Sequence, residues 1–321
     1  MPSRLVCAAL MPRDVVTRAR RDFDAWVVDG DNDMTAAEVI HAASAHRAEA
    51  ILFTNTLPLS AAVIAQLPDT VRVGATSSVG YDHIDVAAAK ARGIMVTNTP
   101  GVLTECTADF AFMMLLAAAR RAYEYDKIMR AGWRYRIGQG DMLGVRVTGK
   151  TLGILGMGRI GQAVAQRARG FEMTVLYHSR HRLPEELEQG ARYFGSFHDM
   201  LPHCDFLSLH APAGPATDKI INAAALASLK PGAVLVNVSR GGLVDEDALV
   251  EALTSGHLFA AGLDVFRTEP DFDMRFAALD NVILSPHIGS GSVETRNAMG
   301  FRALDNIEAV LAGRGAIDPL W

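Results

Sequence analysis

The chain has 321 residues, of which 50% are hydrophobic and 21% are charged, and its formal net charge at pH 7 is -5. This length suggests about two domains, and the hydrophobic content excludes an intrinsically disordered chain. The net negative charge argues against a general nucleic-acid or anionic-membrane surface, so we expect neither as a partner.

The three cysteines are Cys7, Cys106 and Cys204, and they are widely spaced. They form neither a metal-binding spacing nor a disulfide framework, so we expect no metal site and a cytoplasmic location. The longest apolar stretch, 110–119, is far shorter than the roughly 20 residues of a membrane-spanning helix.

Short apolar runs alternate with helical patterns through the first hundred residues. Two amphipathic segments, 36–46 and 60–67, separate such runs, and Thr35 and Ser60 are their expected N-caps. This alternation predicts a parallel sheet with helices on both faces. The predicted strands lie at 5–10, 25–28, 50–53, 71–75 and 94–96.

The same pattern restarts after residue 100. A long helix is predicted over 104–129, and a second helix runs from Gly156 to about Arg169. A last helix, 293–311, ends at Gly313 and is too short to form a domain alone. We therefore expect an α/β protein with two Rossmann-like or flavodoxin-like parallel-sheet domains, the second inserted in the first. The further predicted strands are 151–155, 174–177, 206–209, 234–238, 260–264 and 282–284.

A GxGxxG motif follows the apolar run at 151–155 and opens an amphipathic helix, which is the context of a dinucleotide-binding fingerprint. Gly156 would allow the tight turn, Gly158 would let backbone N–H groups reach a pyrophosphate, and Gly161 would let the helix pack closely on the strand. The N-terminus of that helix also favours an anion. We therefore expect a bound nicotinamide dinucleotide.

The residues after the strand at 174–177 bear on which dinucleotide is bound. An NAD site carries Asp or Glu at this point, whereas this chain has His178, Ser179, Arg180, His181 and Arg182. An arginine there can pair with the 2′-phosphate of NADP, and Ser179 can donate a hydrogen bond to it. We predict a preference for NADP(H), with NAD(H) as the alternative; the sequence leaves open whether Arg180 or Arg182 makes the contact.

Three later strand ends deliver groups suited to reduction of a 2-keto acid. Arg240 can hold the substrate carboxylate and polarise its carbonyl, and His287 can protonate the carbonyl oxygen. Glu269 can orient that histidine and favour its charged form. Asp264 lies at the mouth of a buried strand, where it could join this catalytic group or equally cap the following loop.

Taken together, the motifs resemble the D-isomer-specific 2-hydroxyacid dehydrogenases over nearly the whole chain. The resemblance is strongest to the glyoxylate and hydroxypyruvate reductase branch, whose members often use NADPH. The matching segments are SVGYDHID (78–85), VTNTP (96–100), LTECTAD (103–109), GILGMGRIG (153–161), NVSRG (237–241), GLDVF (262–266), EP (269–270) and PHIGS (286–290).

This resemblance implies a substrate domain of residues 1–100 plus 290–321 and an NAD(P)-binding domain of residues 101–289. It implies that Arg240 and the backbone N–H groups of Val79 and Gly80 bind the substrate, with His287 and Glu269 as the proton-donating pair. The cofactor contacts that it implies are Thr107, Gly156, Gly158, Arg159, Ile160, His178, Ser179, Arg180, His210, Pro212, Val238, Asp264 and Gly289.

It also implies a homodimer built through the cofactor domains. Trp133 is a candidate to enter the partner subunit's substrate pocket, although the segment 133–149 departs from the family pattern. His83 also departs, because it stands where the family usually has Asn.

Four other functions are weighed against this one. Formate dehydrogenases carry Gln at the position of Glu269, and phosphite dehydrogenases carry Lys at the position of Val79, so residue identity disfavours both. A non-catalytic dinucleotide-sensing protein could retain the same catalytic residues. A dehydrogenase for a larger 2-keto acid also stays open, since the sequence does not fix the size of the pocket.

Overall fold

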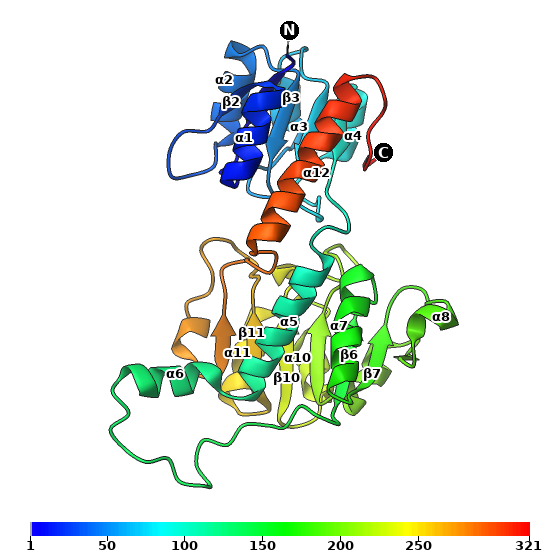
Figure 1. The fold of residues 1–321 in the computed structure, drawn as a ribbon. Helices are drawn as coiled ribbons and strands as arrows, with labels where there is room; N and C mark the ends of the chain where they lie inside the picture. The colour runs from blue at the N-terminus through cyan, green and yellow to red at the C-terminus, as the bar shows by residue number, and fades with distance from the viewer. Residues whose placement is uncertain (1) are drawn as a thin grey trace. The chain divides into compact units, whose positions relative to one another are not determined.

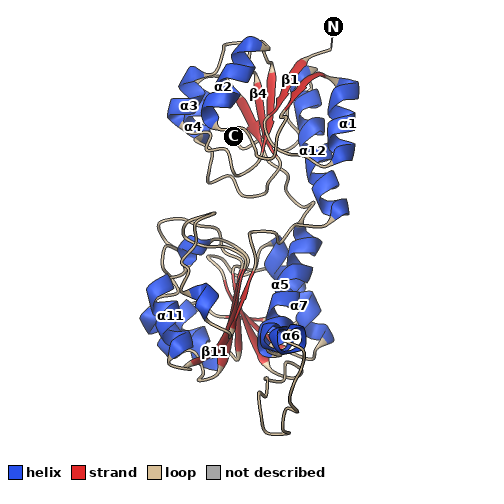
Figure 2. Ribbon diagram, turned by 90° about the vertical axis from the view of Figure 1, so that its left-hand side faces the viewer, coloured by secondary structure: helices blue, strands red, loops and turns tan. Residues whose placement is uncertain are grey.

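The computed structural model describes residues 2–321, and it divides the chain into two compact units (Figure 1). Unit 1 comprises the chain up to Leu103 together with Ser290–Trp321, and unit 2 is Thr104–Gly289. Figure 2 shows that helices cover both faces of the sheet in each unit.

Unit 1 contains a five-stranded sheet in the order β2-β1-β3-β4-β5, and every neighbouring pair is parallel. Its inner strands are apolar and buried on both faces, as expected when helices cover both sides. The strands are β1 (Arg4–Cys7), β2 (Asp24–Val27), β3 (Ala50–Phe53), β4 (Val73–Thr76) and β5 (Met95–Thr97).

Alternate residues of these strands enter two separate cores, because successive side chains of a strand point to opposite faces. Leu5 packs under α1 and α12, whereas Val6 packs under α2, α3 and α4. Both predicted caps are confirmed: Thr35 forms a capping box with Glu38, and Ser60 accepts the Val63 N–H. The helices are α1 (Arg13–Asp22), α2 (Ala36–Ala45), α3 (Ala61–Gln66), α4 (Val86–Ala91) and α12 (Val293–Leu311).

Unit 2 contains a seven-stranded parallel sheet in the order β12-β11-β10-β9-β6-β7-β8. The strand order reverses between β6 and β9, and ligands of open α/β sheets bind beyond the carboxyl ends of the strands at such a point. The strands are β6 (Thr151–Leu155), β7 (Thr174–His178), β8 (Arg192–Tyr193), β9 (Phe206–Leu209), β10 (Ala233–Asn237), β11 (Leu258–Leu263) and β12 (Val282–Leu284).

Two helical layers cover this sheet. One face carries α5 (Thr104–Ala119) and α7 (Arg159–Gly170), and the other carries α10 (Ala223–Ser228) and α11 (Glu246–Thr254) (Figure 2). Arg167 of α7 ties the two helices of the first face together through Glu105 and Asp109. The shorter elements are α6 (Ala122–Arg130), α8 (Glu185–Glu188), α9 (Phe197–Met200) and three 3-10 turns, Leu201–His203, Gly241–Leu243 and Phe276–Ala278.

The prediction of a single helix over 104–129 is wrong, because the chain forms α5 and α6 with a break between them. Arg121 adopts a left-handed conformation, with φ 54°. The carbonyl of Ala119 accepts the Val145 N–H at 2.9 Å, so a later segment uses a group that a continuous helix would need. The apolar pattern also ends here, since no residue of α6 is buried.

The predicted fold class is confirmed by the two parallel sheets. The last helix, α12, spans the predicted 293–311 and packs on the sheet of unit 1. It therefore buries its apolar side chains against the first hundred residues of the chain. Gly313 has φ 73° and follows the C-cap, as expected for the end of a helix. Across residues 2–321, no helix combines the length and the apolarity that crossing a membrane requires.

Candidate active site

The glycine motif forms a tight turn between β6 and α7. Gly156 has φ 95°, and a Cβ added there would lie 2.6 Å from the Ala211 nitrogen. A Cβ at Gly161 would lie 2.3 Å from the Gly156 oxygen. Both glycines are therefore required by close backbone packing, as the fingerprint predicts.

Gly158 differs from these two glycines because an added Cβ would meet nothing within 4 Å. Its backbone faces open space at the N-terminus of α7, and the N–H groups of Arg159 and Ile160 have no acceptor among residues 2–321. Ser179 lies beside the turn, and its Oγ accepts the Met157 N–H at 2.7 Å. These features fit the pyrophosphate of a dinucleotide.

The two arginines after β7 have different surroundings. Arg182 makes a bidentate pair with Glu188, at 2.8 and 2.9 Å, and Tyr177 donates its hydroxyl to the same carboxylate at 2.6 Å. The hydrogen bonds from Arg182 and Tyr177 lower the pKa of Glu188 to about 2. Arg180 is exposed and makes no ion pair within the described chain, so it is the arginine available to a ligand.

Three predicted cofactor residues lie around the turn. His178 is held by its ring, whose Nδ1 lies 2.9 Å from the Phe194 oxygen, and its own carbonyl accepts the Gly156 N–H. His210 follows β9, and burial lowers its pKa to about 4, so the imidazole is neutral at pH 7. Pro212 is exposed in the next loop.

Arg240 follows β10, beyond the buried Val238, in a loop that is closely held. Asn237 donates to the Arg240 carbonyl at 2.9 Å and accepts the Ser239 N–H at 3.1 Å. A Cβ at Gly241 would fall 1.8 Å from the Phe266 carbonyl carbon, so only glycine fits beside this loop. The sequence analysis did not identify either Asn237 or Gly241 as a determinant of where Arg240 lies.

Glu269 and His287 form a direct pair, with Nδ1 of His287 2.7 Å from Oε2 of Glu269. The other carboxylate oxygen accepts the Phe266 N–H at 2.9 Å. Burial of Glu269 opposes its ionisation, but the bonds from His287 and Phe266 and the charge of nearby Arg240 outweigh it and lower the pKa. The carboxylate is thus ionised and oriented toward the imidazole.

Asp264 fixes the loop that carries His287. Its two carboxylate oxygens accept the Ile288 and Gly289 N–H groups, each at 2.8 Å, and its carbonyl accepts the His287 N–H. His287 has φ 51°, a conformation that non-glycine residues adopt rarely. Asp264 therefore caps this loop, and burial raises the pKa of this carboxyl; a contact of Asp264 with the cofactor stays a prediction.

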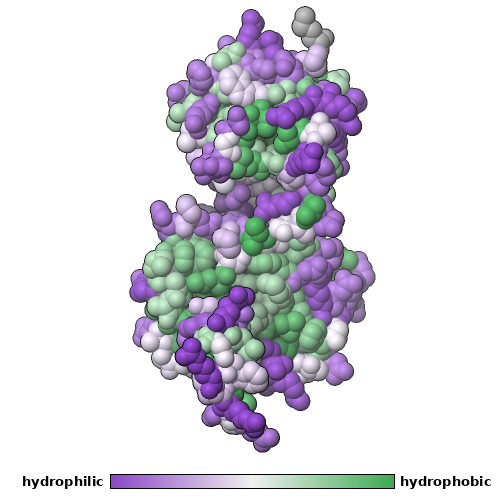
Figure 3. Space-filling view, turned by 60° about the vertical axis from the view of Figure 1, so that its left-hand side comes forward, coloured by the Kyte–Doolittle hydropathy of each residue, from purple (hydrophilic) through white to green (hydrophobic). Residues whose placement is uncertain are grey.

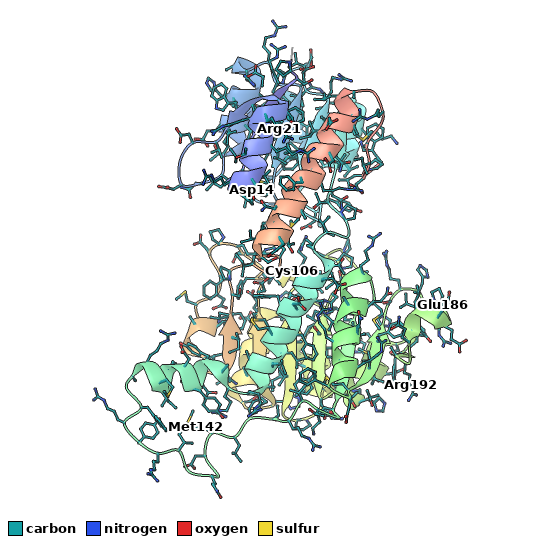
Figure 4. The ribbon with its side chains drawn as sticks, in the orientation of Figure 1. Asp14, Arg21, Cys106, Met142, Glu186 and Arg192 are labelled. Carbon is teal, nitrogen blue, oxygen red and sulfur yellow. The ribbon has the colours of Figure 1, made fainter. Side chains whose placement is uncertain are left out.

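Thr107 and Gly289 lie beside Asp264 in unit 2. A Cβ at Gly289 would be 3.0 Å from Asp264 Oδ2 and 3.6 Å from Thr107 Cγ2. Cys106, next to Thr107, is in the first turn of α5 (Figure 4). The helix α5, the loop after β11 and the loop after β12 therefore meet at one point of unit 2.

The remaining predicted residues lie elsewhere. Val79 and Gly80 form part of the loop that follows β4 of unit 1, where Thr76 Oγ1 lies 3.2 Å from Nε2 of His83. Trp133 is 57% exposed in the loop after α6. No group of His, Cys, Asp and Glu within residues 2–321 has the arrangement to hold a metal ion.

Comparisons with known proteins bear on this arrangement. A family model described as "D-isomer specific 2-hydroxyacid dehydrogenase, NAD binding domain" matches residues 112–289. The glyoxylate reductase of Thermococcus litoralis is 48% identical over 248 residues, which cover 76% of this chain and 75% of that protein. The glycerate dehydrogenase of Hyphomicrobium methylovorum is 39% identical over 311 residues, 94% of each chain.

A solved structure extends the similarity to three dimensions. The NADPH-dependent glyoxylate/hydroxypyruvate reductase of Sinorhizobium meliloti, in complex with NADP and malonate, has a TM-score of 0.87 and 35% identity, and the match covers 100% of this chain and 97% of that one. The chain therefore belongs to the D-isomer specific 2-hydroxyacid dehydrogenase family, as its sequence predicted, and is an NAD(P)-dependent oxidoreductase similar to the glyoxylate and hydroxypyruvate reductases.

Proposed function

We propose that the protein is an NADPH-preferring reductase that converts small 2-keto acids, glyoxylate and hydroxypyruvate, to 2-hydroxy acids. The observation that carries this proposal is the 2.7 Å contact between His287 and an ionised Glu269, with Arg240 near enough to lower the pKa of that carboxyl. A carbonyl reduction needs a proton donor and a group that polarises the carbonyl, and these residues supply both.

Each residue has a separate task in this proposal. Arg240 holds the substrate carboxylate in a planar fork and draws electron density from the adjacent carbonyl. His287 donates a proton to the carbonyl oxygen from Nε2, because its Nδ1 is committed to Glu269. Glu269 keeps the ring in that orientation and stabilises the imidazolium. A bound nicotinamide supplies the hydride.

The preference for NADPH is supported by charge. No carboxylate stands at the end of β7, where an NAD site carries one, and the exposed Arg180 follows Ser179 at that point. Arg180 would pair with the 2′-phosphate, while the N–H groups at the start of α7 would hold the pyrophosphate. The Sinorhizobium meliloti relative is NADPH-dependent, which agrees with this assignment.

The proposal also covers the oligomeric state of the enzyme and its location in the cell. We infer a homodimer formed through unit 2, because large hydrophobic side chains of α6 and the following loop are exposed. Figure 3 shows hydrophobic surface over the face of unit 2 that carries α5 and α6. The exposed residues are Tyr123, Met129, Trp133, Tyr135, Ile137 and Leu143. The three free cysteines agree with a reducing cytoplasm.

The loop that carries this exposed surface is held in place by a hydrogen bond within unit 2. The loop is tied back to α6, since Tyr125 donates its hydroxyl to the carbonyl of Met142 at 2.6 Å (Figure 4). Light scattering on the purified protein should give the mass of two chains. Replacing Trp133 and Tyr135 with Ser should shift the mass toward one chain, and an unchanged dimer in that variant would exclude this surface.

The deciding experiment measures oxidation of NADPH and of NADH, side by side, with glyoxylate and with hydroxypyruvate. We expect turnover with both acids and a higher kcat/KM with NADPH. His287→Ala should lower kcat by about 10²- to 10⁴-fold, the contribution of a positioned general acid, and leave NADPH affinity intact. Binding of both cofactors without oxidation of either would exclude the proposed reaction and favour a dinucleotide-sensing protein or a larger 2-keto acid.

A further inference from the structure

The side-chain amide of Asn237 is bonded to the backbone on both sides of the peptide that joins Ser239 to Arg240. Asn237 is the last residue of β10 and is 1% exposed. Its Oδ1 accepts the Ser239 N–H at 3.1 Å, and its Nδ2 donates to the Arg240 carbonyl at 2.9 Å. These two bonds fix which way the amide is turned, because the N–H only donates and the carbonyl only accepts.

The guanidinium of Arg240 is bonded to the same short segment. Its Nη1 donates to the Ser239 carbonyl at 2.8 Å, and that carbonyl belongs to the peptide between the two that Asn237 holds. Because a peptide is planar, each residue has only two soft backbone dihedral angles. Bonds on both sides therefore restrict the rotation at Ser239 and Arg240, and Asn237 determines the direction in which the Arg240 side chain leaves the backbone.

The strands beside β10 hold this loop from two directions. On the β9 side, the Ser239 hydroxyl donates to the Ala211 carbonyl. On the β11 side, Gly241 lies so close to Phe266 that an added Cβ would be 2.0 Å from the Phe266 oxygen. These contacts fix where the loop lies, whereas the backbone conformation at Arg240 depends on Asn237.

We propose that Asn237 is a positioning residue that holds the Arg240 guanidinium in the orientation needed to bind the substrate carboxylate. This inference rests on the proposed function, in which Arg240 binds that carboxylate. Asn237 is buried and acts through the backbone of Ser239 and Arg240. Without its amide, the loop keeps its place between its neighbours but Arg240 gains rotational freedom. A small rotation at the backbone then becomes a large displacement at the end of this long side chain.

The test replaces Asn237 with Leu, which has nearly the same shape and makes neither hydrogen bond. We expect KM for glyoxylate to rise by about tenfold or more, as for a lost hydrogen bond and a misplaced binding group. KM for NADPH should not change. The alkaline limit of kcat should stay where it lies in the wild type, because Glu269 and His287 keep their own hydrogen bonds.

Asn281→Leu is the matched control. Nδ2 of Asn281 donates to the Phe259 carbonyl at 3.2 Å and to the Leu253 carbonyl at 3.4 Å. Asn281 directly precedes β12, whereas Arg240 follows β10, so the two residues lie at opposite edges of the parallel sheet. This variant also loses an asparagine that bonds to the backbone of unit 2, and its KM for glyoxylate should equal that of the wild type.

A double-mutant cycle tests whether Asn237 acts through Arg240. Asn237→Leu should lower kcat/KM for glyoxylate when Arg240 is present and have little further effect in the Arg240→Ala variant. A role in general stability would lower kcat/KM by the same factor in both backgrounds, and that result would overturn the proposal. Calorimetric binding of oxamate, a carboxylate that is not reduced, to the NADPH-bound protein measures the same contact without turnover. Its affinity should fall in Asn237→Leu and stay unchanged in Asn281→Leu.

Asn237→Ser covers the case in which Asn237→Leu does not fold. A serine hydroxyl can still accept the N–H two residues further on, as in an ST-turn, but it is too short to reach the Arg240 carbonyl. We expect KM for glyoxylate to rise by about three- to tenfold, as for the loss of one hydrogen bond. A folded Asn237→Ser protein with the wild-type KM would overturn the proposal.

The outcomes separate this inference from the proposed function. An active wild type whose KM for glyoxylate and affinity for oxamate are unchanged in Asn237→Leu would overturn the positioning role alone. A wild type that binds oxamate but reduces neither keto acid would overturn the proposed reaction, and a loss of oxamate affinity in Asn237→Leu would still support the positioning role. A wild type that neither binds oxamate nor reduces either acid would overturn both.

Discussion

His287 donates its Nδ1–H to Glu269 over a distance of 2.7 Å. His287 lies in the loop after β12, and Glu269 lies in the loop after the neighbouring strand, β11. The tautomer follows from the charge: the pKa of Glu269 is lowered, so the carboxylate is ionised and accepts a hydrogen bond rather than donating one. Nε2 is then left to meet a substrate. The pair therefore has one chemical orientation, set by its own hydrogen bonds.

Glu269→Gln should move the alkaline limit of reduction to lower pH. The pKa of Glu269 is lowered, so the carboxylate is ionised at and above its ordinary pKa, and at neutral pH it stabilises the imidazolium. The neutral amide keeps the shape but removes that charge, and the protonated histidine is lost at lower pH. The measurement is kcat/KM for glyoxylate between pH 5 and 9.

Glu246→Gln is the matched control for this charge change. Glu246 is the first residue of α11, where its carboxylate accepts the Arg267 N–H at 2.9 Å, and it does not contact His287. Its pH profile should stay where the wild-type profile lies. A Glu269→Gln profile that does not move would refute the assignment of this carboxylate as the partner of the proton donor.

Arg240→Ala should raise KM for the keto acid and lower kcat together, because in the proposed function the guanidinium both binds the carboxylate and polarises the carbonyl. The loss in kcat/KM should be about 10- to 100-fold or more, as for a charge-assisted bidentate contact. Arg240→Lys should recover only part of it, since an ammonium lacks the planar fork. Arg267→Ala, which removes a nearby exposed arginine paired with Asp218, should leave the kinetics unchanged.

Gly158→Ala should separate cofactor binding from folding. An added methyl group meets nothing in the protein, so the thermal midpoint should stay close to that of the wild type. The same methyl group would occupy the space expected for the pyrophosphate, and KM for NADPH should rise at least about tenfold. Calorimetry and steady-state kinetics on one preparation give both values.

Gly161→Ala is the opposite case and serves as the comparison. Its added Cβ would lie 2.3 Å from the Gly156 oxygen, which is backbone and cannot move aside without opening the turn. We expect a destabilisation of about 1–3 kcal/mol or more, typical of overpacking. If Gly158→Ala binds NADPH as tightly as the wild type, the space beside Gly158 is not the cofactor site.

Much of the architecture could be read from the sequence because parallel sheets leave a strong signal. Buried strands such as β6 and β9 are continuous apolar runs, and their predicted bounds, like those of α12, match the structure. The break at Arg121 could not be read in this way. It depends on Val145, more than twenty residues later, which takes the carbonyl that ends α5.

The site shows the same division between local and distant causes. Arg240, Glu269 and His287 each follow a predicted strand, so topology alone brings them to one edge. Which of Arg180 and Arg182 is paired within the protein could not be predicted, since this depends on Glu188, which is buried six residues beyond Arg182. A carboxylate spaced in this way was visible in the sequence, but nothing local marked it as buried.

The exposed Arg180 and the paired Arg182 should therefore respond in opposite ways to substitution. Arg180→Ala should narrow the preference for NADPH over NADH by about tenfold or more, because the exposed guanidinium is the group free to pair with the 2′-phosphate. It should leave the thermal midpoint unchanged. Arg182→Ala should do the reverse: it strips Glu188 of its bidentate partner and leaves a buried carboxylate with Tyr177 alone, which lowers stability.

The measurements are the ratio of kcat/KM for the two cofactors and the thermal midpoint of each variant without cofactor. Arg192→Ala controls for the loss of a positive charge from β8, the strand next to β7, and it should change neither quantity appreciably. If Arg182→Ala removed the NADPH preference while Arg180→Ala kept it, the phosphate would have to draw Arg182 away from Glu188. Cofactor binding would then break the Arg182–Glu188 ion pair. NADPH would raise the thermal midpoint of the wild type by less than its contacts with the protein imply.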